Sequence, residues 1–140
     1  MTYEQWEAQV PNEIRNDPVW NVEAYRLGLF MSDLAWPDST RLLKDRRMRG
    51  VADQLYRAAS NISSNVCEGY SRSTGADRAR FCEYALGSAR ETRDFYYKAR
   101  HVLKEEVASH RMSLATKIVG LNVTMIKTER RRPRIKQREG

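Results

Sequence analysis

Histidine and cysteine are scarce in this chain of 140 residues, which contains only two of each. Cys67 and Cys82 fall near apolar positions of expected helices, where a free cysteine acts as a small hydrophobic side chain. His101 and His110 do not stand at a spacing from these cysteines that is typical of a zinc site. We therefore expect no bound metal ion, and we expect the two cysteines to be reduced rather than joined in a disulfide.

Long apolar runs and catalytic signatures are missing as well. No run approaches the ~20 residues of a membrane helix, and residues 1–10 have neither the basic start nor the apolar core of a secretion signal. The sequence contains no glycine-rich phosphate loop, no paired histidines on a helix and no supported serine–histidine–aspartate set. These absences predict a cytoplasmic protein that is not an enzyme, needs no cofactor and does not enter a membrane.

Positive charge is present in excess and is unevenly distributed. The chain has 25 lysines and arginines against 18 acidic residues, a net charge of +7. Residues 127–140 contain seven of the basic residues and two of the acidic ones, so +5 lies there and +2 in residues 1–126. Such a charge density suits a polyphosphate partner, but a tail that only aids solubility would look the same.

Four segments show the apolar spacing of amphipathic helices. The first begins at Asp17-Pro18, where the aspartate can cap free amides, and ends at the break expected from Pro37. A short additional helix near the N-terminus carries Trp6. The other three long helices are expected at about 40–70, 75–104 and 106–127.

This pattern predicts an all-α protein, an antiparallel up-down four-helix bundle. We expect residues 1–16 to form a short N-terminal extension, residues 17–127 the bundle and residues 128–140 a flexible basic tail. The last helix has a second apolar flank of Val119, Val123 and Ile126, which would face water in a monomer and therefore favours self-association.

Two basic segments are candidates for contact with nucleic acid: the start of the second expected helix and the C-terminal tail. The residues concerned are Arg41, Lys44, Arg46, Arg47, Arg49, Lys127, Arg130, Arg131, Arg132, Arg134, Lys136 and Arg138. The third helix also mixes tyrosines with cations. Because Glu91 and Asp94 interrupt that charge, core tyrosines beside a solvated face are the better interpretation there.

Polar and small side chains lie close to the apolar face of the second helix. Asn65 and Glu68 could serve a site, or they could fix the helix through contacts one turn away, such as Glu68 with Arg72. The second interpretation is favoured, because a carboxylate without a second acid or a histidine nearby is a poor catalytic group. The small residues around them would let another backbone approach closely.

Three short motifs carry a family resemblance: Arg57-Ala58-Ala59, the segment Ser64-Asn65-Val66-Cys67-Glu68-Gly69, and Gly87-Ser88. They resemble the four-helix-bundle proteins encoded in intervening sequences of bacterial large-subunit ribosomal RNA genes, over roughly residues 17–126. Ser63, Cys67 and Arg80 depart from the family pattern, which more often has proline, alanine and an acid there. The residues assigned to the motif in a structural role are Arg57, Asn65, Glu68, Gly69, Arg72, Gly87 and Ser88.

The resemblance implies a homo-oligomer, a pentameric ring of bundles, without known catalytic activity. A related group, the accessory variability determinants of diversity-generating retroelements, binds nucleic acid and a reverse transcriptase. The leading hypothesis is thus an oligomer that binds RNA, or less readily DNA, by electrostatics. The alternative is a protein-interaction scaffold or accessory subunit of a reverse transcriptase or other nucleic-acid enzyme, and a hydrolase using Glu68 ranks below both.

Overall fold

The structure is a computed structural model, and it describes residues 1–132. Within this range the chain forms six α-helices and two short 3-10 helices, and no strand occurs there. The elements are α1 (Tyr3–Glu7), α2 (Asn12–Arg15), η1 (Pro18–Asn21), α3 (Glu23–Leu42), η2 (Arg46–Met48), α4 (Arg49–Tyr70), α5 (Gly75–Ala99) and α6 (Glu105–Arg130). The predicted all-α class is confirmed.

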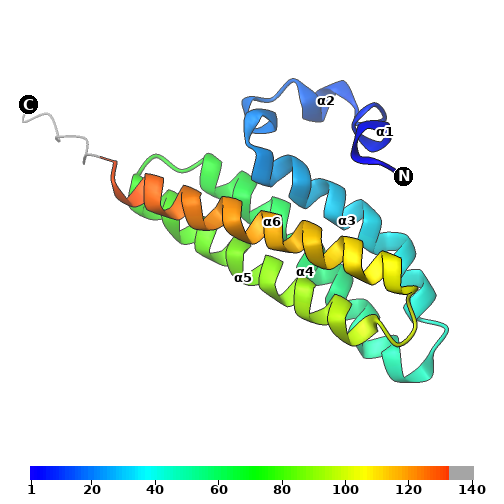
Figure 1. Cartoon of the computed structure of the whole chain (residues 1–140). Helices are drawn as coiled ribbons and strands as arrows, with labels where there is room; N and C mark the ends of the chain where they lie inside the picture. Colours follow the sequence, from blue (N-terminus) through cyan, green and yellow to red (C-terminus); the bar gives the residue numbers. More distant parts are fainter. Residues whose placement is uncertain (133–140) are drawn as a thin grey trace, which may run out of the picture.

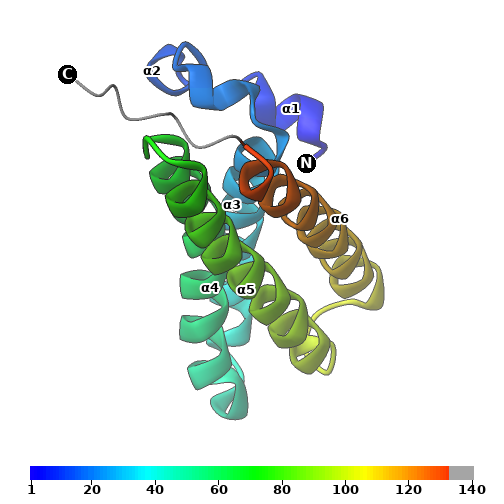
Figure 2. The ribbon, with the colours of Figure 1, turned by 90° about the vertical axis from the view of Figure 1, so that its left-hand side faces the viewer.

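The four long helices pack together, each against the next one along the chain, and α3 also contacts α6 (Figures 1 and 2). The α3–α4 and α5–α6 connections lie at one end of the molecule. The α4–α5 connection lies at the other end, beside the C-terminal turn of α6 (Figure 1). None of the helices in residues 1–132 has the length and apolar character needed to cross a membrane.

Apolar stripes at helical spacing form the core between these helices. Met31 from α3, Leu55 and Ile62 from α4, Tyr96 from α5 and Ile118 from α6 are all inaccessible to solvent. Alanines on α4, α5 and α6 are buried beside them, and their small size lets the helices approach closely. The periodicity of the sequence therefore located the core faces of α3 and α4 correctly.

The expected second apolar flank on the last helix is not free. Ile126 is itself buried, at 8% exposure, and Val119 packs against the main core while Val123 is half-buried. The core stripe of α6 runs through Ala115, Ile118 and the buried Asn122 to Ile126, so it includes one residue of the expected flank. The flank therefore gives no argument for self-association.

Pro37 does not end the first long helix, contrary to the prediction. Helix α3 continues through it to Leu42. Pro37 lies on the exposed side, while the residues of the next turn, Asp38, Ser39 and Leu42, are buried against the other helices. Tertiary contacts on the inner side thus hold this last turn, although the proline removes one backbone hydrogen bond on the outer side.

The second long helix begins nine residues later than predicted, at Arg49. Residues 40–42 belong to α3, and the segment between the helices forms a turn that contains η2. Asp45 caps this 3-10 helix by accepting a hydrogen bond from the backbone N–H of Arg47 at 2.9 Å. The third helix likewise ends at Ala99 rather than near 104, and the fourth runs from Glu105 to Arg130.

The N-terminal extension is packed onto α3. Trp6 is 4% exposed and lies against Phe30 and Leu34, and its indole N–H donates a 2.6 Å hydrogen bond to the Asp33 carboxylate. Asp17 accepts from the backbone N–H of Val19 at 3.0 Å, but it caps the 3-10 helix η1 and not the first long helix. The extension therefore covers part of the outer face of α3 (Figure 1).

Candidate nucleic-acid interface

Five of the predicted nucleic-acid contacts lie together in the connection between α3 and α4. We call residues 41–49 the basic turn; its five cations are Arg41, Lys44, Arg46, Arg47 and Arg49. All five are exposed. Buried Leu42 and half-buried Met48 fasten the turn to the core at either side. The turn therefore presents its cations to solvent from two apolar anchors.

The basic turn has a net charge of +4, since its only acid is Asp45. That carboxylate is already engaged, because Arg47 Nη2 lies 3.2 Å from it. The hydrogen bonds from the Arg47 side chain and backbone hold the pKa of Asp45 below its ordinary value. Within residues 1–132, Arg41, Lys44, Arg46 and Arg49 have no ion-pair partner. Four uncompensated cations thus share one short surface segment.

The C-terminal cations are placed differently from the prediction. Lys127 lies in the last helix, where it was expected, but α6 continues to Arg130 and so extends into residues 128–140, the segment expected to be a flexible tail. Arg130 forms an ion pair with Glu83 of α5, and Arg132 Nε lies 2.9 Å from Glu129. The Arg132–Glu129 approach is an ion pair without hydrogen-bond geometry.

Part of the C-terminal charge is therefore already balanced within the protein. Arg131 follows the helix as its C-cap and is exposed. The predicted contacts Arg134, Lys136 and Arg138 lie outside the described residues.

The two basic segments lie at opposite ends of the molecule (Figure 1). Helix α6 connects one end to the other, and its 26 residues correspond to about 39 Å at 1.5 Å per residue. One short stretch of nucleic acid on a single subunit therefore cannot lie compactly over both. The basic turn is the denser of the two described sites.

Two family-motif residues near the end of α4, Asn65 and Glu68, contact groups one helical turn away. Asn65 Nδ2 donates to the Asn61 carbonyl at 2.9 Å. Glu68 pairs with Arg72 at 2.6 Å, and the Arg72 guanidinium lies 4.8 Å from the centre of the Phe81 ring. Glu68 is exposed, so the geometry offers nothing for the hydrolase hypothesis.

Position 69 requires a glycine because α4 and α5 approach closely there. A Cβ placed on it would lie 2.8 Å from Phe81 Cβ and 3.3 Å from the Arg78 carbonyl oxygen. Gly87 differs, because it is exposed in the middle of α5 and no atom lies within 4 Å of the corresponding position. Arg57 makes an exposed ion pair with Asp53, and the Ser88 carbonyl accepts from Thr92.

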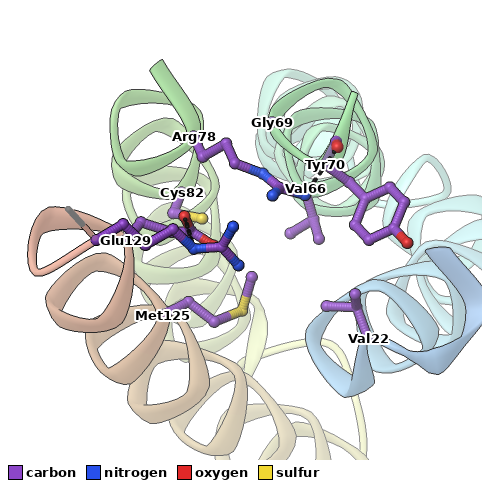
Figure 3. Close-up of a pocket in the computed structure, with 9 residues that line it drawn as sticks. Val22, Val66, Gly69, Tyr70, Arg78, Cys82, Met125 and Glu129 are labelled. Carbon is purple, nitrogen blue, oxygen red and sulfur yellow. Dashed lines mark hydrogen bonds and ion pairs between the residues drawn. The ribbon is translucent and has the colours of Figure 1, made fainter. Parts of the chain in front are cut away.

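A small pocket of about 210 Å³ lies beside the α4–α5 connection, and Figure 3 shows its lining residues. Val66 and Met125 form its apolar part, while Arg78 and Glu129 stand at its rim. Arg78 donates to the Tyr70 carbonyl at 2.9 Å and is therefore occupied. Burial raises the pKa of the Cys82 thiol in this pocket, and nearby Glu129 raises it further.

Both cysteines are free, as predicted. A thiol whose pKa is raised stays neutral, which makes Cys82 a poor nucleophile. No cluster of three or more potential metal ligands occurs among residues 1–132. The residues that line the pocket therefore form neither a reactive thiol nor a metal site.

A buried polar network that the sequence reasoning missed holds the last turn of α3 in place. Asp38 is 2% exposed and accepts hydrogen bonds from Tyr96 Oη of α5 at 2.7 Å and from Arg111 Nε of α6 at 2.8 Å. The low polarity around the phenol and the adjacent carboxylate raise the pKa of Tyr96 far above its ordinary value. The network joins three helices a few residues before the basic turn begins.

A signal for this network was present in the sequence. Asp38 stands on the apolar stripe of α3, four residues after Leu34 and four before Leu42, and all three are buried. Arg111 stands likewise between Ala108 and Ala115 on α6. An acid and a base at core positions of different helices indicate a buried ion pair. The expected helix break at Pro37 hid that pattern.

The fold and site together define an all-helical protein of four long packed helices with an exposed cationic turn at one end. The sequence matches the family model of the 23S rRNA-intervening sequence proteins over residues 28–126. The chain belongs to this family. The match contains the basic turn and every motif residue, and it leaves out α1, α2 and the C-terminal cations. No curated protein matches the sequence.

A solved structure supports the same fold. It is that of a protein of unknown function from the S23 ribosomal protein family of Bacteroides thetaiotaomicron VPI-5482. The two chains are 19% identical, with a TM-score of 0.69, and the similarity covers 74% of this chain and 98% of that one. At this identity the likeness concerns the fold alone.

Proposed function

We propose that this protein is a non-enzymatic RNA-binding protein that holds RNA phosphates electrostatically at the basic turn. The four long helices serve it as an antiparallel up-down four-helix bundle, a rigid support for that turn. The observation that carries the proposal is the set of four cations in residues 41–49 that have no ion-pair partner within residues 1–132, beside an acid that is already bound by Arg47. The family name, which refers to 23S rRNA, favours RNA over DNA.

Repetition of the site would strengthen weak contacts. The family resemblance supports a homo-oligomer, in particular a homopentamer. Several basic turns on one assembly would raise the effective concentration of cations around a single RNA. The exposed cations Lys127 and Arg131 would add further affinity without reading sequence.

The alternative function, a scaffold or accessory subunit of a reverse transcriptase or other nucleic-acid enzyme, rests on the resemblance only. The scaffold and the direct RNA binder predict different results when the native complex is treated with nuclease. A stoichiometric enzyme partner that stays bound after nuclease treatment would favour the scaffold, whereas loss of all partners with the RNA favours direct binding.

The test is RNA binding as a function of salt, measured by fluorescence anisotropy with a labelled structured RNA. The variant carries Arg41→Gln, Lys44→Gln, Arg46→Gln and Arg49→Gln. If each cation contacts one phosphate, the slope of log K against log salt should become less steep by about 3, at ~0.7 per contact on single strands. The wild-type protein should lose about 50-fold in affinity between 50 and 200 mM salt from these four contacts alone.

A charge-matched control uses four cations that are exposed but already paired. Its substitutions are Arg72→Gln, Arg80→Gln, Lys98→Gln and Lys117→Gln, whose partners are Glu68, Asp77, Asp94 and Glu23. Both variants lose the same net charge, so a local site predicts a large effect only for the basic turn. Equal losses in the two variants, or salt-independent binding by the wild type, would refute the proposal.

A further inference from the structure

An exposed aromatic pair lies on the same surface as the basic turn. Trp36 of α3 is 63% exposed and Tyr56 of α4 is 37% exposed. Their ring centres are 5.2 Å apart, with an angle of 73° between the planes. Because this is an edge-to-face contact, the face of at least one ring is not covered by the other.

The helical repeat connects this pair to the basic turn. Leu43 follows Trp36 by seven residues, and Arg49 precedes Tyr56 by seven residues. Seven residues are nearly two full turns, so each aromatic ring lies on the same helix face as the residue at the turn, about 10 Å away. Leu43 is 51% exposed and extends the apolar surface toward the cations.

Two of the three acids near this surface are paired with arginines, while the third, the exposed Asp33 one turn before Trp36 on α3, accepts only the indole N–H of Trp6 within residues 1–132. Asp53 lies between Arg49 and Tyr56 on α4, and it pairs with Arg57 at 3.3 Å. Asp45 of the basic turn pairs with Arg47. Apart from Asp33, what remains uncompensated is a surface of two aromatic rings bordered by cations.

We propose that the Trp36–Tyr56 pair is a stacking site for an unpaired RNA base, whose neighbouring phosphates are held by the basic turn. The inference rests on the proposed function and adds to it the substrate class, single-stranded or looped RNA. Aromatic side chains stack on any exposed base, whereas the bases of a continuous duplex are stacked on one another and unavailable to a side chain. The aromatic pair therefore matches the base of a nucleotide, and the basic turn matches its phosphate.

Charge complementarity favours RNA over a second copy of this chain as the occupant. A two-fold contact between two copies over this surface would bring two basic turns together, each with a net charge of +4. Among the described residues of this face, Asp45 and Asp53 are paired with arginines, and Asp33 alone does not offset that repulsion. In the head-to-tail contacts of a ring this surface would face another part of the next subunit, and the mass of the assembly in Trp36→Ala tests that case. RNA supplies negative charge and flat apolar rings at once.

The experiment compares Trp36→Ala with the wild type on two RNA probes, a 12-nucleotide oligouridine and a blunt duplex with the same number of phosphates. Loss of one stacked base should weaken oligouridine binding about 5- to 150-fold. Duplex binding and the salt slope should not change, because the phosphate contacts remain. Trp36→Phe, which keeps a flat ring, should restore most of the affinity, while Trp36→Leu should not.

Tyr84→Ala is the matched control. Tyr84 is 49% exposed and also makes an edge-to-face contact, with Phe81 at 5.5 Å, but it lies on α5. It should bind both probes as the wild type does. Quenching of tryptophan fluorescence by oligouridine should also disappear in Trp36→Phe, because Trp6 is buried and the half-buried Trp20 packs against Trp6 and Tyr25 before the start of α3, at the end of that helix far from Trp36.

The inference is overturned if Trp36→Ala binds oligouridine with wild-type affinity, or if it weakens binding to both probes equally. It is also overturned if the substitution changes the mass of the assembly in solution, because a second subunit then covers this face. In each of these cases the variant of the basic turn still decides the proposed function separately. If that variant and the wild type bind RNA alike, the failure belongs to the proposed function.

Discussion

Replacing Asp38 by asparagine should destabilise the protein strongly, because it removes the charge that two buried donors share. Tyr96 Oη and Arg111 Nε both donate to the same oxygen, Oδ2, at 2.7 and 2.8 Å. Asparagine has almost the same shape, so the substitution leaves no cavity. It leaves Arg111, whose side chain is 15% exposed, without its only acidic partner among residues 1–132.

The expected magnitude follows from the burial of the pair. Removing one partner of a buried ion pair lowers the free energy of unfolding by ~3–5 kcal/mol. The amide oxygen can still accept one hydrogen bond, so we expect about 3 kcal/mol, the low end. For a chain of this size that is a fall in Tm of about 10 °C. Urea unfolding followed by circular dichroism measures both the free energy and its slope.

Asp53→Asn is the control for this prediction, because Asp53 forms an ion pair with Arg57 in which both side chains are more than 70% exposed. It should change stability by no more than about 0.5 kcal/mol. Tyr96→Phe removes one donor and should cost about 1.5–3 kcal/mol. In a double-mutant cycle the effects of Asp38→Asn and Tyr96→Phe should not add. If Asp38→Asn behaves like Asp53→Asn, the network does not hold the helices together.

Two further predictions concern close packing and pH. Gly28→Ala should lower the free energy of unfolding by about 1–3 kcal/mol, because its Cβ would lie 2.7 Å from Ile62 Cγ2. At the open position 87, Gly87→Ala should instead raise the stability of the isolated subunit by up to ~1 kcal/mol. A change in the mass of the assembly in Gly87→Ala would show that another subunit lies close to this position. Burial, and then Glu7, raise the pKa of Tyr3 from 10.0 to about 12. Its contribution is therefore complete below pH 10 and is lost as the pH rises to 12, so Tyr3→Phe should flatten the stability profile in that window and not at neutral pH.

Helical periodicity was enough to predict the class of the fold and the inner faces of α3 and α4. Leu55 and Ile62 recur at a spacing that only a helix places on one side, and both are fully buried. Helix ends were predicted less well, since they depend on contacts between segments distant in sequence. Pro37 illustrates the difference: its local preference is to break a helix, and the buried Asp38 and Leu42 that follow it override that preference.

The wrong boundary between the first two long helices also changed the interpretation of the candidate site. As part of a helix, residues 41–49 would point their cations in all directions around an axis, and Leu42 and Met48 would have no common role. As a turn between two helices, the segment places Leu42 in the core, lays Met48 against it and leaves the five cations exposed.

The position of that turn is set by the end of α3, and the end of α3 is held by the contacts of Asp38 with α5 and α6. The variant of the basic turn in which four cations are replaced by glutamine should therefore lose RNA affinity without losing stability. Asp38→Asn should show the opposite order, with stability falling first and RNA affinity following only as the last turn of α3 becomes mobile. RNA affinity and stability should therefore be measured on both the variant of the basic turn and Asp38→Asn. A local cationic site held by a rigid anchor predicts that the first variant loses affinity alone and the second loses stability first, whereas a general effect of charge does not.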